Sequence, residues 1–101
     1  MKVSILRGGG LAGITTRTEV ASAELPADAA RTLEQHAEAV APAPPPRERH
    51  PDEMLYTVRV EHDGESREAH YTDSTLPDEV RSLISWADKR PERREDIVRP
   101  R

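Results

Sequence analysis

Cysteine and phenylalanine are both absent from this chain of 101 residues. The absence of cysteine excludes disulfides, a thiolate nucleophile and cysteine-ligated zinc, and it fits a reducing compartment. Aromatic residues amount to 3%, one Trp and two Tyr, so the core has to be built from aliphatic side chains. A chain of this length is expected to fold as one domain with a small margin of stability.

Long apolar runs are also missing. The first residues contain no stretch typical of a signal peptide, and no segment approaches the length and apolarity of a membrane span. We therefore expect a soluble, cytoplasmic protein that does not bind a membrane.

The charge of the chain is acidic and unevenly distributed. The net charge is −4, and residues 88–101 carry six basic and four acidic side chains, which leaves −6 on the first 87 residues. A nucleic-acid-binding surface needs clustered cations, so an acidic body argues against such a partner. The basic residues near the end fit a charged, flexible tail over residues 91–101.

Two alternating segments predict a hairpin at the beginning of the chain. Residues 2–7 and 14–20 each alternate with a period of two, which is typical of strands. Between them lies Gly8-Gly9-Gly10-Leu11-Ala12-Gly13, whose glycines permit the positive φ angles of a tight connection.

A helix is predicted next, beginning at Pro26, a residue that suits the first turn of a helix. Its apolar positions have helical spacing: Ala29, Ala30, Leu33, Ala37 and Val40. Five prolines then interrupt regular structure between about residues 41 and 53, which predicts an extended, proline-rich loop inside one domain.

The second half repeats this order. Residues 54–61 alternate again, Asp63-Gly64 marks a two-residue turn, and a return strand is expected over about 66–72. In this register Tyr56 and Tyr71 would be cross-strand neighbours. A second helix should begin near Pro77 and end near Lys89, before Pro91.

These elements predict an α+β fold of two layers, with a four-stranded antiparallel sheet and two helices on one of its faces, in the order ββα-ββα. The domain would span residues 1–90. Tyr56, Tyr71 and Trp86 are expected in the core, whereas Leu6 and Leu55 fall on the outer face of the sheet.

No pattern for catalysis is present. The chain has neither a glycine-rich phosphate loop followed by lysine nor a serine nucleophile elbow. The four histidines are His36, His50, His62 and His70. With a two-residue turn, His62 and His70 lie several pairs apart on opposite faces and cannot share a metal ion. We expect a binding protein rather than an enzyme, with no metal and no cofactor.

Several short motifs occur in an order that resembles the emfourin family. They are Val3-x-x-x-Arg7-Gly8-Gly9-Gly10-Leu11-Ala12-Gly13-Ile14, Glu24-Leu25-Pro26, Pro51-Asp52-x-Met54-x-Tyr56-x-Val58-x-Val60, Tyr71-x-Asp73 and Leu76-Pro77-Asp78-x-Val80-Arg81. The resemblance implies a cytoplasmic bacterial protein that inhibits protealysin-type, thermolysin-like zinc metallopeptidases by direct contact, and we expect it to be a monomer when free.

Gly8, Gly9, Gly10, Leu11, Ala12 and Gly13 are the candidate peptidase-binding residues. Thermolysin-like enzymes prefer an apolar residue just after the scissile bond, so Leu11 could enter that pocket while the glycines allow close approach. In the alternative interpretation Leu11 begins the second strand and packs inward, and the glycines only form the turn. A non-inhibitory interaction domain that uses the outer sheet face or a strand edge is the alternative function.

Overall fold

The computed structural model describes residues 1–9, 14–44 and 53–98. Its elements in chain order are β1 (Lys2–Gly9), β2 (Thr15–Ala21), the 3₁₀ turn η1 (Ser22–Glu24), α1 (Ala27–Glu38), β3 (Met54–His62), β4 (Glu65–Thr72), α2 (Asp78–Asp88) and β5 (Arg94–Val98).

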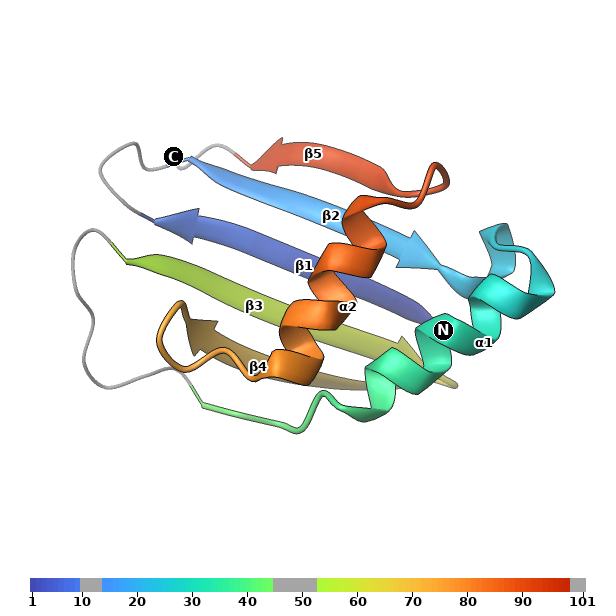
Figure 1. The fold of residues 1–101 in the computed structure, drawn as a ribbon, viewed down its shortest axis with the longest axis horizontal. Helices are drawn as coiled ribbons and strands as arrows, with labels where there is room; N and C mark the ends of the chain where they lie inside the picture. Colours follow the sequence, from blue (N-terminus) through green and yellow to red (C-terminus); the bar gives the residue numbers. More distant parts are fainter. Residues whose placement is uncertain (10–13, 45–52, 99–101) are drawn as a thin grey trace.

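The strands form one antiparallel sheet in the order β4-β3-β1-β2-β5, and both helices lie on the same face of it (Figure 1). The two-layer α+β architecture is therefore confirmed. Strands β1 and β3 join the two hairpins at the centre of the sheet, where Ile5 pairs with Val58. Among the described residues, no helix has the length and apolarity needed to cross a membrane.

The sheet has five strands, so the prediction of four was wrong by one. The additional strand, β5, pairs with β2 within the segment that the sequence analysis assigned to a charged tail. Three of its five residues are charged, and all five are exposed. Because β5 contributes no buried residue, it lacks the alternation of apolar and polar residues that identifies a strand in a sequence.

The core lies between the sheet and the helices. From the sheet come Val3, Ile5, Val20, Val58, Val60, Ala69 and Tyr71, and from the helices come Leu33, Ala37, Val80, Leu83, Ile84 and Ala87. Tyr56 and Trp86 are partly buried and pack against this cluster, as expected. Burial of each large aliphatic side chain contributes about 1.5–3 kcal/mol.

The β3–β4 hairpin confirms the predicted register. Asp63 and Gly64 both have positive φ, 51° and 78°, which is the geometry of a type I′ turn. With two residues in the turn, His62 pairs with Glu65, and Tyr56 consequently lies opposite Tyr71.

Arg67 connects β4 to the end of α1. Its guanidinium donates hydrogen bonds to the carbonyl oxygens of Ala37 and Val40. Ala37 belongs to the last turn of α1 and Val40 follows the helix, so this side chain holds the end of the helix and the segment after it against β4. After the helix, Ala43 pairs with Ala69 along the outer edge of β4.

Candidate functional site

The predicted binding segment starts at the end of β1, and two of its six residues, Gly8 and Gly9, lie within the described part of the chain. Gly8 is buried, opposite Thr15 of β2 and Leu55 of β3. Gly10, Leu11, Ala12 and Gly13 lie outside the described residues. The direction of Leu11 therefore stays a prediction.

Close packing at Gly8 and backbone conformation at Gly9 explain why these two positions carry glycine. A Cβ atom on Gly8 would lie 2.4 Å from the Thr15 Oγ1 atom, which is far inside van der Waals contact. Gly9 has a φ of +110°, and a Cβ there would lie 3.0 Å from the carbonyl oxygen of Glu53. Packing against β2 and β3 thus explains these two glycines independently of any partner.

The end of the sheet that holds Gly9 also holds the ends of its neighbours. Gly9 pairs with Met54 at the start of β3, and Thr15 at the start of β2 pairs with Val98 at the end of β5. We call this the loop end of the sheet. It brings together chain segments that are far apart in the sequence.

Hydrogen bonds attach the turn after β4 to this end. The Asp73 carboxylate accepts a hydrogen bond of 2.9 Å from the Tyr56 hydroxyl and another of 3.2 Å from the Met54 backbone N–H. The Glu53 carboxylate accepts from the Ser74 hydroxyl at 2.7 Å and from the Ser74 N–H at 3.1 Å. The turn between β4 and α2 is therefore held against the beginning of β3.

The Tyr56 hydroxyl is a poor acid in this position. Burial raises the pKa of Tyr56 above its usual range, and the hydrogen bond to Asp73 raises it further. The tyrosine consequently stays protonated and acts as a donor in this contact. Its role is structural, since it fixes the turn rather than serving as a base.

Arg7 joins the last residue of α2 to the sheet. Its guanidinium donates to the two carboxylate oxygens of Asp88 at 2.8 and 2.5 Å, and to the Thr18 hydroxyl at 3.0 Å. The hydrogen bond with Asp88 raises the pKa of Arg7. A two-point contact of this kind fixes the orientation of both side chains.

Exposed aliphatic side chains are found next to the loop end. Within the described residues, the exposed large hydrophobic side chains are those of Ile14, Ile97 and Val98. Beside Ile97 is a cavity of about 430 Å³ on the helix-bearing face, lined by Arg7, Thr16, Thr18, Glu95, Asp96 and Ile97. Leu6 and Leu55, which were expected on the outer face of the sheet, are half-buried on the face opposite the helices.

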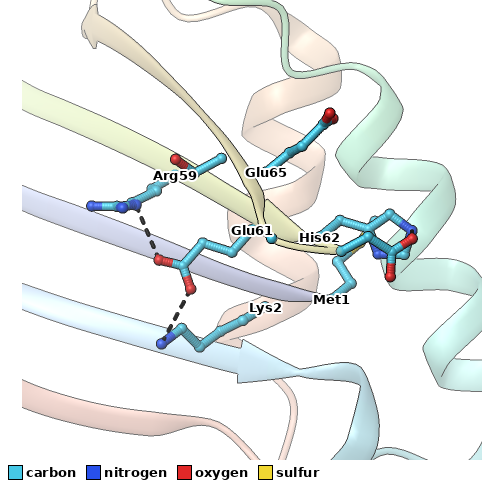
Figure 2. Close-up of a pocket in the computed structure, with 9 residues that line it drawn as sticks. Met1, Lys2, Arg59, Glu61, His62 and Glu65 are labelled. Carbon is cyan, nitrogen blue, oxygen red and sulfur yellow. Dashed lines mark ion pairs between the residues drawn. The ribbon is translucent and has the colours of Figure 1, made fainter.

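A second hollow, of about 440 Å³, lies at the other end of the sheet, around Lys2 and the β3–β4 turn (Figure 2). Glu61 lies 3.1 Å from Arg59 and 3.5 Å from Lys2, and His62 contacts Asp63 at 3.2 Å. Glu61 therefore pairs with two cationic side chains, and these groups are open to solvent. The hollow is open to water, whereas acid–base catalysis needs a desolvated setting.

The described histidines are distributed over the molecule. His36 packs against Trp86 with ring centroids 5.6 Å apart, and His70 lies 3.2 Å from the Thr57 hydroxyl. Across residues 1–9, 14–44 and 53–98, no three His, Asp or Glu side chains converge as ligands for a metal ion. His50 lies outside these ranges.

Sequence reasoning identified Arg7, Tyr56 and Asp73 as parts of motifs, but it missed their contacts. The partner of Arg7 is 81 residues away, and Tyr56 meets Asp73 only because β3 and β4 pair. The predicted hairpin register could have indicated the Tyr56–Asp73 contact, since Asp73 follows the strand that contains Tyr71, the partner of Tyr56. No comparable signal pointed to Asp88.

The fold is that of a small α+β domain in which the Arg7–Asp88 pair attaches one helix to the sheet. A sequence model of the emfourin family matches residues 5–88. The match covers most of the chain, from β1 to the last residue of α2, and the chain therefore belongs to the emfourin family. Searches of curated proteins and of solved structures gave no significant match.

Membership of this family indicates a protein inhibitor of thermolysin-like metallopeptidases and agrees with a role other than catalysis. The match ends at Asp88, the partner of Arg7, and β5 lies beyond it. The fifth strand is therefore outside the family-matched part of this chain.

Proposed function

We propose that this protein inhibits a protealysin-type, thermolysin-like zinc metallopeptidase in the bacterial cytoplasm by blocking the active-site cleft through direct binding. The observation that carries the proposal is the family match over residues 5–88, which includes the central strands and both helices. The free inhibitor acts as a monomer, and neither nucleic acid nor membrane is part of its function.

The connection from Gly8 to Gly13 makes the central contact with the enzyme. In this proposal Leu11 occupies the apolar pocket that receives the residue after the scissile bond. Support comes from the rigid attachment of the described flank, because Gly8 packs against Thr15 and Arg7 is held by Asp88. A binding segment with fixed ends loses less conformational entropy when it binds.

The neighbouring turn adds to this rigidity. Asp73 and Ser74 are attached to the beginning of β3 by the hydrogen bonds of Tyr56 and Glu53. The loop end is therefore anchored from both sides of β1, by β2 and by β3. Such anchoring lowers the rate at which the bound segment changes to a conformation that the enzyme can cleave.

The test is a titration of a protealysin-type peptidase with this protein near stoichiometric ratios, with residual activity measured on a peptide substrate and the inhibitor followed by mass spectrometry. Saturating loss of activity while the inhibitor stays intact is the expected result. Undiminished activity, or rapid digestion of the chain, would refute the proposed inhibition.

A further inference from the structure

The two edges of the sheet differ in how they are covered. At one edge, β4 exchanges backbone hydrogen bonds with Ala43, which accepts from the His70 N–H at 3.1 Å and donates to the Glu68 carbonyl at 3.4 Å. At the other edge is β5, and no described residue pairs with its outer side. An edge strand of this kind has N–H and C=O groups that point away from the sheet.

Charged side chains are one of the devices by which natural proteins protect such an edge. On β5 each charged side chain is neutralised by a neighbour from its own chain. Asp96 lies 3.3 Å from Arg17, Arg94 lies 2.7 Å from Glu24, and Glu95 lies 2.7 Å from Arg93. Each charged side chain of β5 therefore already forms an ion pair within its own chain.

The second half of the strand is apolar and open. Ile97 is 63% exposed and Val98 is 38% exposed. They pair with Thr16 and Thr15 respectively, so their side chains point to opposite faces of the sheet. A strand added beside β5 would cover both aliphatic side chains, one on each face, while it pairs with the free backbone groups.

A second copy of the chain gains no ion pair when all five residues of β5 pair with all five residues of the copy. Consider two antiparallel copies of β5 in which every residue of one strand has a partner in the other. Asp96 then lies opposite Asp96 of the copy, and Glu95 lies opposite Ile97 of the copy. This arrangement contains no ion pair. A parallel arrangement would place each charged residue beside its own copy. Like charges across a strand pair are destabilising, so neither of these two arrangements favours a second copy, and self-association is one of the outcomes that the experiment distinguishes.

We propose that β5 is a strand-addition site for the target peptidase: an extended segment of the enzyme, with aliphatic residues beside Ile97 and Val98, pairs with the outer edge of β5 as a sixth strand. This inference rests on the proposed inhibition. Val98 lies opposite Thr15, at the loop end, so this contact is continuous with the one made by the Gly8–Gly13 connection. Main-chain pairing supplies affinity, and the two aliphatic side chains supply selectivity.

Because β5 lies outside the family-matched residues 5–88, it adds a second contact to a domain that already carries the first. The two contacts are expected to contribute differently to inhibition. Loss of the loop contact weakens inhibition strongly, whereas loss of the β5 contact weakens it less and leaves a functional inhibitor.

The experiment compares the wild-type chain with Ile97→Lys and Val98→Lys, using Ser85→Lys as a control because it adds the same charge at an exposed position of α2. Inhibition constants are measured against a protealysin-type peptidase. In parallel, hydrogen exchange of the β5 backbone amides is measured in the free protein and in the complex. Circular dichroism and sedimentation report folding and self-association.

Each edge lysine is expected to raise the inhibition constant by about tenfold or more, while Ser85→Lys leaves it unchanged. The β5 amides should exchange more slowly in the complex. Normal inhibition by both edge variants, with unchanged exchange of β5, would refute strand addition and leave the proposed inhibition intact. A wild-type chain that neither binds nor inhibits the peptidase would refute both. A wild-type dimer that Ile97→Lys converts to a monomer would assign the edge to self-association instead.

Discussion

Arg7 of β1 and Asp88 of α2 are joined by two hydrogen bonds of 2.8 and 2.5 Å, although 81 residues separate them in the chain. Arg7 directly precedes Gly8, the first residue of the candidate binding segment. Asp88 is the last residue of the helix that covers the centre of the sheet. The end of α2 therefore holds the strand from which the binding segment departs.

Removal of Asp88 should destabilise the fold. Asp88→Ala leaves a partly buried guanidinium with one of its partners, Thr18, and we expect the free energy of unfolding to fall by about 1–2 kcal/mol, because both side chains are partly solvated. Urea denaturation measures the loss. Asp96→Ala is the matched control, since its partner Arg17 is at 3.3 Å and Asp96 is largely exposed. Equal losses in the two variants would contradict a special role for the Arg7–Asp88 pair.

Gly8→Ala should destabilise the protein for a steric reason. The new Cβ atom would lie 2.4 Å from the Thr15 Oγ1 atom and 3.1 Å from its Cβ atom. Overpacking of this kind costs about 1–3 kcal/mol. In the double variant with Thr15→Ala the closest contact disappears, so part of the lost stability should return in thermal or urea denaturation. If Thr15→Ala restores nothing in that background, the clash is not the cause.

Much of the fold was predictable because its signals are local. Alternation identified four strands, and the Asp63-Gly64 turn set the register that places Tyr56 opposite Tyr71. Strand β5 was missed because its residues are charged or exposed and its pairing depends on the edge of β2. A strand that buries no side chain leaves no periodic pattern in the sequence.

The candidate site was predictable only in position. Two alternating segments placed Gly8 and Gly9 in the connection between two strands, whereas the structure includes both glycines in β1, where they pair with Leu55 and Met54. The contacts that hold the loop end of the sheet could not be predicted from the sequence. Arg7 with Asp88, and Glu53 with Ser74, are set by how the helix crosses the sheet, which is a property of the packed tertiary structure.

Alkaline solution should destabilise the protein. Burial raises the pKa of both Tyr56 and Tyr71 above the ordinary value of 10.0. The folded state therefore favours the neutral phenol. This contribution to stability is complete below pH 10 and declines as the pH rises through the folded-state pKa values. Denaturation at a series of pH values, with phenolate absorbance as a second readout, should show the decline. Tyr56→Phe removes one of the two titrating groups, so its stability should fall less steeply; an equally steep fall would exclude Tyr56 as a contributor.

Leu11→Asp tests the central contact of the proposed inhibition. If the Leu11 side chain enters the apolar pocket of the peptidase, a carboxylate in its place should weaken binding by about 2–4 kcal/mol, as truncation of a central hot spot does. Leu11→Met, which keeps the apolar character and approximate volume, should inhibit nearly as well as the wild type. Inhibition constants and denaturation curves are needed together, because they separate the two interpretations of Leu11. Weakened inhibition with unchanged stability assigns Leu11 to the enzyme contact, whereas lost stability with an unchanged inhibition constant assigns it to the inward-packed start of the second strand.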